Sequence, residues 1–250
     1  MNHNPRWEII QGDAVKILTQ SAPGTFDAVI TDPPYASGGR TQAEKTKSPA
    51  KKYSSMGDNA PPSFEGEAMD QRSWINWCAD WLRAARLASK SGAPLCVFID
   101  WRQIPSLTDA VQRAGWIWRG IAVWDKGNSR PQRGRFRQQT EFIVWGSNGD
   151  MPISRPVPCL PGVFRQGNPQ NRIHLTQKPL EVMRGIVRIT EPGGHILDPF
   201  AGSGTTVLAA VMEGYTATGV ELSQEYARLA EERVRTELEK DPRPDGADPA

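Results

Sequence analysis

The feature that most constrains the fold of this chain is the stretch 198–206, D-P-F-A-G-S-G-T-T. It follows a short apolar run at 195–197, which comes directly after the turn residues 192–194, as expected for a buried parallel strand. Gly202 and Gly204 allow the backbone to approach a ligand closely. The stretch therefore predicts a strand end, a glycine turn and a helix start at the edge where open α/β sheets bind ligands. A tight turn without a ligand is the alternative.

A carboxylate, Glu221, follows the glycine turn after one expected helix and one expected strand. After an expected helix at 207–213, the strand expected at 215–220 leads into Glu221. Such folds bind a ribose diol with an acid at about this place. Glu221 could instead cap the helix that follows, but its position one strand–helix–strand unit after the glycine turn favours the ribose interpretation.

The glycine turn also separates two kinds of nucleotide ligand. A nicotinamide-binding turn needs a third glycine for close packing of helix and strand, and the sequence has Val207 where that glycine would fall. This weakens a pyrophosphate-binding interpretation. A nucleoside without phosphates, such as S-adenosylmethionine (AdoMet), fits the shorter turn better.

A sharper motif, T-D-P-P-Y, occupies residues 31–35, immediately after the apolar strand expected at 26–30. Its two prolines fix two φ angles and remove two N–H donors, so the chain leaves the strand rigidly with its carbonyls free. An amine there can donate hydrogens to the Asp32 carboxylate and the Pro33 carbonyl. Tyr35 offers a stacking face, typically worth about 1–3 kcal/mol per base; a rigid loop with a packed tyrosine is the alternative. The candidate catalytic residues are Asp32, Pro33, Pro34 and Tyr35.

These motifs resemble those of the amino-methyltransferases of DNA, in the permuted subgroup called β-class, and most resemble the N6-adenine enzymes. D-P-P-Y at 32–35 is similar to the catalytic motif of that family, and 198–206 is similar to its AdoMet motif. H-L-T-Q-K-P at 174–179 resembles a third motif, H-P-T-Q-K-P, from which Leu175 departs. Related methyltransferases of protein glutamine and ribosomal RNA place the glycine turn first, whereas here it comes last.

The resemblance implies an α/β, Rossmann-like methyltransferase fold with a doubly wound, mostly parallel, seven-stranded and circularly permuted sheet. We expect a single domain over 1–240, with a catalytic half at 7–125 and an AdoMet-binding half at 174–240. A mobile loop is expected at 36–72, a DNA-recognition region at about 126–173, and a disordered tail at 241–250.

The resemblance also implies which residues contact the cofactor. In the family, a G-D pair like that at 12–13 contacts the adenine of AdoMet; the alternative for Asp13 is the cap of a short helix. The expected cofactor-binding residues are Asp13, Ala14, Asp32, His174, Thr176, Lys178, Pro199, Phe200, Gly202, Ser203, Gly204, Thr205, Glu221 and Leu222.

The implied function is transfer of a methyl group from AdoMet to the N6 amine of adenine in double-stranded DNA, by base flipping and direct displacement, with S-adenosylhomocysteine as product. Cytosine N4 is the alternative, because both bases offer an aromatic exocyclic amine. A nucleotide-cofactor oxidoreductase and a non-catalytic DNA-binding protein are remote alternatives. Members of the family often dimerise, so a homodimer is an expectation, and the sequence does not indicate whether a partner nuclease exists.

Basic residues cluster locally, although the net charge is only +2. The stretch 126–140 contains five basic residues and no acid, interleaved with glutamine and asparagine, a composition suited to phosphate and base-edge contacts. A second basic stretch spans 40–52, where it could close over DNA. A solvated basic loop is the alternative. The expected DNA-binding residues are Arg40, Lys45, Lys47, Lys126, Arg130, Arg133, Arg135 and Arg137.

Three further features carry weaker interpretations. Tryptophans at helical spacing in 73–88 indicate a helix packed into the core or an interface. The triplet 100–102, D-W-R, follows a buried strand and could line the substrate pocket or form an ion pair. The proline-rich segment 146–173 argues against regular structure and is a candidate for target recognition or a surface connector.

Other classes of protein are disfavoured. Three cysteines without a C-x-x-C pair and three scattered histidines do not predict a disulfide framework or a metal site. Neither a long apolar run nor a signal-peptide pattern occurs, which favours a soluble, intracellular protein that does not bind membranes. The resemblance implies a cytoplasmic, DNA-associated protein of bacterial or phage origin.

Overall fold

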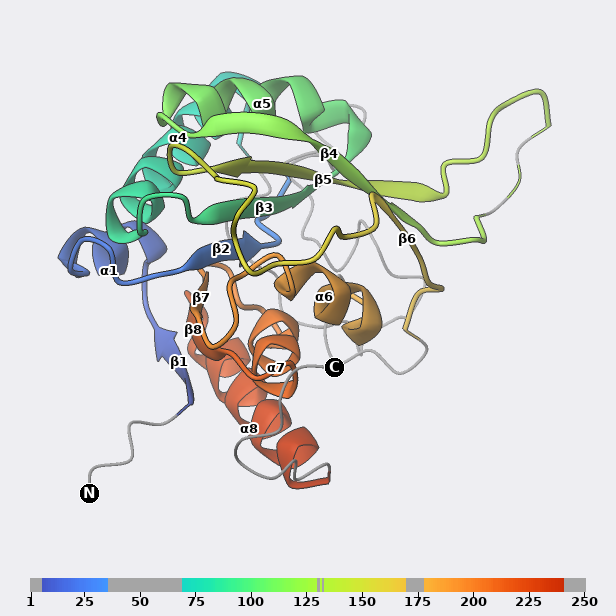
Figure 1. The fold of residues 1–250 in the computed structure, drawn as a ribbon. Coiled ribbons are helices and arrows are strands. Elements are labelled where there is room, and N and C mark those ends of the chain that lie inside the picture. Colours follow the sequence, from blue (N-terminus) through green and yellow to red (C-terminus); the bar gives the residue numbers. More distant parts are fainter. Residues whose placement is uncertain (1–5, 36–68, 130, 132, 170–177, 241–250) are drawn as a thin grey trace.

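The computed structural model describes residues 6–35, 69–129, 131, 133–169 and 178–240. Their centre is an eight-stranded sheet with the order β1-β8-β7-β2-β3-β5-β4-β6 (Figure 1). The strands are β1 (Trp7–Gln11), β2 (Ala28–Thr31), β3 (Pro94–Ile99), β4 (Ile117–Asp125), β5 (Thr140–Ser147), β6 (Val163–Arg165), β7 (His195–Asp198) and β8 (Thr216–Glu221).

Strand directions bring together the segments that carry the motifs. β1, β8, β7, β2 and β3 are joined by parallel pairings, and only β5 runs antiparallel, to β3 on one side and to β4 on the other. β2 lies directly beside β7, with Val29 opposite Leu197. The predicted convergence of an early strand with a late strand is therefore confirmed, as expected for a permuted, mostly parallel sheet.

The number of strands differs from the expected seven, because β6 adds an eighth at the edge. β6 lies inside the proline-rich segment that argued against regular structure, and it pairs with β4 in parallel from Val123 to Asp125. Its three residues contain no proline, so their N–H groups can join the edge of the sheet. The prediction of an irregular connector was wrong over these residues.

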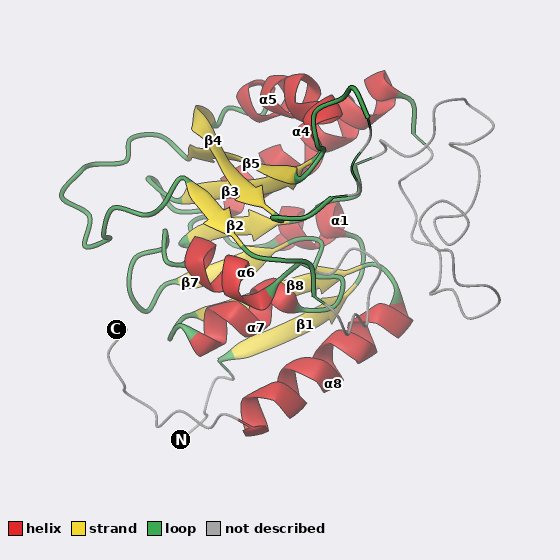
Figure 2. Ribbon diagram, turned by 90° about the vertical axis from the view of Figure 1, so that its right-hand side faces the viewer, coloured by secondary structure: helices red, strands yellow, loops and turns green. Residues whose placement is uncertain are grey.

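Helices cover both faces of the sheet, as a doubly wound fold requires (Figure 2). Buried residues of α1 (Ala14–Gln20), α4 (Gln71–Ala88) and α5 (Ile104–Arg113) form one core cluster. The other cluster contains buried residues of α6 (Leu180–Val187), α7 (Thr205–Met212) and α8 (Gln224–Lys240). A single 3-10 turn, η1 (Trp101–Gln103), precedes α5.

The tryptophans of α4 belong mainly to the core, which was the favoured interpretation. Trp74 and Trp81 are completely buried, and both belong to the same core cluster as the buried Leu82. The helix begins two residues earlier than expected, because the Asp70 carboxylate accepts hydrogen bonds from the N–H groups of Arg72 and Ser73.

One boundary matters for the site. The strand expected at 26–30 is β2, and it extends to Thr31, with all four of its residues buried. Phe26 forms only an isolated bridge with Ser89. Because β2 ends at Thr31, Asp32 is the first residue beyond the sheet, at the edge where parallel strands end.

A candidate active site at the edge of the sheet

The ends of β2 and β7 are linked by a buried hydrogen bond. The Thr31 hydroxyl donates to Asp198 Oδ1 at 2.6 Å, across 167 positions of sequence. Asp32 follows on one strand and the glycine turn follows on the other. The two predicted motifs therefore lie at one edge of the sheet.

The loop after β2 is held at three points. The Tyr35 hydroxyl donates to Asp32 Oδ1 at 2.5 Å, the Trp74 indole N–H donates to the Pro34 carbonyl at 2.8 Å, and the Gln103 amide donates to the Tyr35 carbonyl at 3.1 Å. Trp74 and Gln103 come from α4 and η1, so two separate elements fix the loop. Within the described part of the chain, the Pro33 carbonyl accepts no hydrogen bond.

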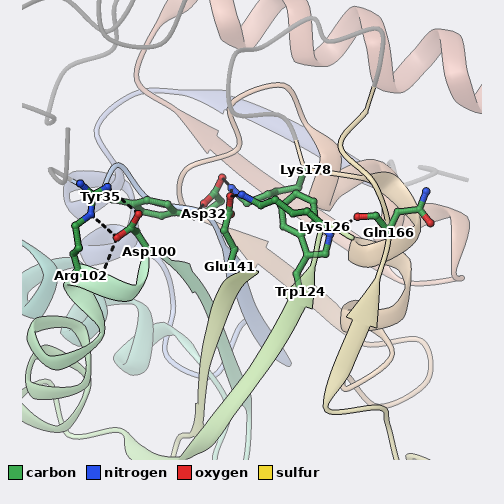
Figure 3. Close-up of polar contacts among 9 residues, drawn as sticks. All are labelled: Asp32, Tyr35, Asp100, Arg102, Trp124, Lys126, Glu141, Gln166 and Lys178. Carbon is green, nitrogen blue, oxygen red and sulfur yellow. Dashed lines mark hydrogen bonds and ion pairs between the residues drawn. The ribbon is translucent and has the colours of Figure 1, made fainter. Parts of the chain in front are cut away.

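Four side chains of alternating charge lie in a row at the site: Asp32, Lys178, Glu141 and Lys126 (Figure 3). We call them the charged line. Lys178 Nζ lies 2.5 Å from Asp32 Oδ2 and 3.3 Å from Glu141 Oε2. The other Glu141 oxygen accepts a hydrogen bond from Lys126. Glu141 lies at this edge because β5 runs antiparallel to β3 and β4. The first residues of β5 therefore lie where β2, β3 and β4 end.

Burial and mutual attraction set the charges of this line. Burial raises the pKa of Asp32, against the opposing effect of the Lys178 ammonium. Burial also acts to raise the pKa of Glu141, but Lys178 and Lys126 hold it below its usual value. Although burial disfavours the ammonium, the two carboxylates hold the pKa of Lys178 above its usual value. The line is therefore a set of paired charges in a poorly solvated place.

Glu221 braces the glycine turn from the neighbouring strand. Its carboxylate accepts the N–H of Gly202 at 2.9 Å and the N–H of Ser223 at 2.9 Å. Each oxygen keeps a further lone pair, which suits a ribose diol. A Cβ at Gly202, where φ is +52°, would meet no atom closer than 4.0 Å, so the turn is open on that side. The bond from the Ser223 N–H, directly before α8, fits the helix-cap interpretation, and the remaining lone pairs fit ribose binding, so both interpretations of Glu221 agree with this geometry.

Other residues of the turn face inward. Gly204 has φ of +74°, and a Cβ there would lie 3.0 Å from Val234 Cγ2 of α8. The Arg233 guanidinium donates to the buried hydroxyls of Ser203 and Thr205, at 3.1 and 2.8 Å. The side chains of Ser203 and Thr205 therefore hold the turn to α8, and their contact with a cofactor stays a prediction.

Phe200 forms part of an aromatic group with α4. Its ring centroid lies 5.2 Å from that of Trp77 and 5.2 Å from that of Trp81. The residue is half-buried, and it packs against the core cluster that contains Trp81. The sequence predicted Phe200 as a cofactor residue but gave no signal for its contact with α4.

Most of the remaining predicted cofactor residues lie beside the glycine turn, because β1 is next to β8 and the Gly12 N–H donates to the Glu221 carbonyl at 2.9 Å. Asp13 caps α1 by accepting the N–H of Lys16 at 2.9 Å, which was the alternative interpretation. Ala14 and Pro199 are buried, and Leu222 is 48% exposed beside Glu221. Lys178 lies with Asp32 rather than with the glycine turn.

The predicted DNA-binding residues fall into two groups. Arg133, Arg135 and Arg137 are exposed on the long loop between β4 and β5, which projects from the sheet in Figure 1. Lys126, at the base of this loop, is instead paired with Glu141, so it is a poor candidate for a phosphate contact. Phe136, between two of the arginines, is 96% exposed. We call residues 126–139 the basic arm.

Several predictions lie outside the described residues. They are the roles of Arg40, Lys45, Lys47, Arg130, His174 and Thr176, the mobility of most of loop 36–72, and the disorder of tail 241–250.

The triplet 100–102 forms an ion pair. Asp100 Oδ1 lies 2.8 Å from Arg102 Nε, and the same carboxylate caps η1 through the Arg102 N–H. These contacts support the structural interpretation of the triplet, while Trp101 is 53% exposed.

The sequence interpretation missed three functional candidates, Glu141, Trp74 and Gln103. Glu141 carried one signal, since it is the first acid after the basic stretch and stands at the start of a strand. Trp74 and Gln103 carried none, because their bonds to the catalytic loop depend on the packing of α4 and η1.

Two absences apply only to the residues that the structure describes. No group of three or more His, Cys, Asp or Glu side chains among them is arranged to hold a metal ion. None of their helices is long and apolar enough to span a bilayer.

Known DNA methyltransferases are similar to this chain in sequence. The N6/N4 methyltransferase family model, described as DNA methylase, matches residues 26–156 and 159–232. The type II methyltransferase M2.LlaDCHI of Lactococcus lactis subsp. cremoris is 27% identical over 248 residues, covering 90% of this chain and 88% of that protein.

Solved structures support the fold. The M1.HpyAVI–SAM complex aligns with a TM-score of 0.64 at 22% identity, covering 91% of this chain and 98% of the other. PvuII DNA methyltransferase (cytosine-N4-specific) aligns with a TM-score of 0.67 at 16% identity, covering 94% of each chain. The predicted methyltransferase fold is confirmed. Because the family model matches most of the polypeptide, the chain belongs to the N6/N4 DNA methylase family.

Proposed function

We propose that this protein transfers a methyl group from AdoMet to the N6 amine of adenine in double-stranded DNA. The observation that carries the proposal is the placement of Asp32 beside the end of β7, where the glycine turn begins. D-P-P-Y at 32–35, which resembles the motif of the adenine enzymes, favours N6. Membership of the DNA methylase family makes an oxidoreductase untenable.

The residues present fit AdoMet as the methyl donor. The open side of Gly202 admits a ligand close to the backbone, and the Glu221 carboxylate keeps lone pairs for a ribose diol. Gly202, Glu221 and the exposed part of Phe200 would hold it. Bound AdoMet supplies an electrophilic methyl group, whose bond to sulfur breaks with both electrons remaining on the sulfur.

The chain itself orients the amine. Asp32 and the Pro33 carbonyl accept one hydrogen each, which directs the nitrogen lone pair toward the donor. The nitrogen forms the new bond to carbon and afterwards loses one proton, for which the Asp32 carboxylate is the adjacent acceptor. Positioning of this kind can lower a barrier by about 7–11 kcal/mol in favourable cases, so no covalent intermediate on the enzyme is needed.

The target base must leave the duplex, because its amine is otherwise paired. Flipping costs a few kcal/mol, which contacts to the DNA backbone must offset. The exposed arginines of the basic arm are suited to those contacts, since they project from the sheet edge that carries Asp32. Tyr35 offers a ring face beside Asp32 for the flipped base.

Cytosine N4 is the second candidate target. The family model covers both amines, and one structural neighbour is named as cytosine-N4-specific. The site chemistry suits either base, since both offer a conjugated exocyclic amine.

The test is methyl transfer from labelled AdoMet to duplex DNA of random sequence, followed by mass spectrometry of the released nucleosides. The proposal predicts N6-methyldeoxyadenosine, and its absence from Asp32→Ala reactions. N4-methyldeoxycytidine would instead establish the second candidate. DNA binding without methylation of any sequence would establish a non-catalytic DNA-binding protein.

A further inference from the structure

Asp32 cannot receive the amine freely in the arrangement observed. Oδ1 accepts the Tyr35 hydroxyl at 2.5 Å, and Oδ2 is paired with Lys178 Nζ at 2.5 Å. An ammonium at that distance withdraws charge from the oxygen and occupies the space in front of it. Oδ2 keeps a second lone pair, but the amine would have to share that oxygen with an ammonium, whose charge-assisted hydrogen bond is stronger than one from a neutral, weakly basic amine.

Glu141 offers Lys178 a second carboxylate. Its Oε2 atom lies 3.3 Å from Lys178 Nζ, yet it is buried and accepts no hydrogen bond from the described residues. A buried carboxylate oxygen without a hydrogen bond is costly, so it is a ready acceptor. Its other oxygen is held by Lys126, which fixes the direction of the carboxylate.

The surroundings of Lys178 favour transfer of the ammonium between the two acids. The side chain is 6% exposed, so the ammonium cannot turn to bulk water instead. Its nitrogen lies 5.4 Å from the Tyr35 ring centroid and 5.2 Å from the Phe98 ring centroid, and these aromatic faces tolerate a cation in either position. Asp32 and Glu141 are the two carboxylates within ion-pair distance of Lys178 in the described part of the chain.

We propose that Glu141 is a positioning residue for methyl transfer: it takes the Lys178 ammonium when the target amine arrives, which frees Asp32 Oδ2 to accept a hydrogen from that amine. The proposal rests on the catalytic role proposed for Asp32. Glu141 acts through Lys178 and does not itself touch the base. The charges of the line remain balanced, because the lysine changes its partner without losing its proton.

A double-mutant cycle tests the proposal. Glu141→Gln removes the charge that draws Lys178 away, so the single-turnover rate should fall about tenfold or more while the Kd for AdoMet stays within about twofold. Lys178→Met removes the competitor for Asp32. In that background, Glu141→Gln should change the rate by less than about twofold. An equal loss in both backgrounds would mean that Glu141 merely supports the fold, and would overturn the proposal.

A second comparison does not depend on the Lys178 variant being folded. Glu141→Asp keeps the charge but shortens the side chain, whereas Glu141→Gln keeps the shape without the charge. The proposal requires the aspartate variant to be faster than the glutamine variant. A glutamine variant as fast as, or faster than, the aspartate variant would contradict it.

Asp32→Asn, measured alongside, separates the two levels of the account. If this variant methylates DNA at the wild-type rate, the proposed function of Asp32 fails, whatever residue 141 does. If it is inactive while Glu141→Gln retains the wild-type rate, only the inference about Glu141 fails.

Discussion

The charged line and the basic arm lie at the same edge of the sheet but use charge in opposite ways. In the line, Lys178 is 6% exposed and has two carboxylates within 3.3 Å. On the arm, Arg133, Arg135 and Arg137 are exposed and form no ion pair with described residues. Buried charges are costly unless paired, whereas exposed arginines keep their hydration and their freedom to bind phosphate.

This difference separates two tasks. The line fixes one geometry for one reacting group, so a change of a single atom there should alter the rate. The arm provides charge to a surface that differs from one DNA sequence to another, so losses there should be graded and sensitive to salt.

The largest effect is expected at Asp32. Asp32→Asn keeps the shape of the side chain but removes the charge that orients the amine, so kcat should fall by about 10²–10³, as for loss of one donor or acceptor aimed at a transition state. AdoMet and DNA should bind as before, which titration of each ligand would check. A loss of binding equal to the loss of rate would remove the distinction between the line and the arm.

The next effect is on stability and concerns Asp198, the last residue of β7, which accepts the hydrogen bond from Thr31. Burial raises its pKa to about 6, so its contribution to stability is present in full below its ordinary pKa and is lost as the pH rises through about 6. The loss should be on the order of 3 kcal/mol, since one unit of pKa shift is about 1.4 kcal/mol.

Asp198→Asn measures this contribution, because the amide oxygen can still accept from Thr31 and the Phe200 N–H. Urea unfolding at about pH 4 and about pH 7 should show a smaller fall in unfolding free energy for the variant than for the wild type. Equal pH dependence in the two proteins would show that the pKa of Asp198 is not raised by burial in the folded state.

An intermediate effect is expected from the arm. Replacing Arg133, Arg135 and Arg137 together with glutamine should weaken DNA binding and reduce the slope of log K against log salt by about 2 to 3, or about 0.9 per phosphate contact. The rate at saturating DNA should be little changed. Arg235→Gln is the matched control, since that exposed arginine lies on α8 and is paired with Glu231. An unchanged slope in the triple variant would remove the arm from the interface.

The smallest effect is expected from a matched pair of tryptophans on α4. Both are completely buried, but only the Trp74 indole N–H donates to the Pro34 carbonyl, while the Trp81 indole N–H bonds no oxygen of the described residues. Trp74→Phe should therefore cost about 1 kcal/mol more stability than Trp81→Phe. It should also lower kcat more, because it loosens the catalytic loop. Equal effects would show that this hydrogen bond does not position the loop.

Much of the fold could be predicted from sequence because its signals are local. The strand expected at 215–220 follows a glycine and became β8 (Thr216–Glu221), whose two ends lie one residue from those expected. β6 was missed because three residues in a proline-rich segment carry no periodic pattern, and only the edge of β4 gives them a partner.

The candidate site was predictable to the same degree. Asp32 and the glycine turn stood out because prolines and glycines mark special backbone geometry. Glu141 and Lys126 did not, since their roles depend on one antiparallel strand that brings the start of β5 to an edge made mostly of strand ends. The sequence predicts Lys126 as a DNA-binding residue, whereas the pairing of β4 with β5 places it beside Glu141.

The most direct test of the central claim is a crystal structure of the protein with bound S-adenosylhomocysteine. We predict that the product lies over Gly202 with its ribose on Glu221 and its sulfur facing Asp32. Product bound at another edge of the sheet, or with its sulfur directed away from Asp32, would contradict the account.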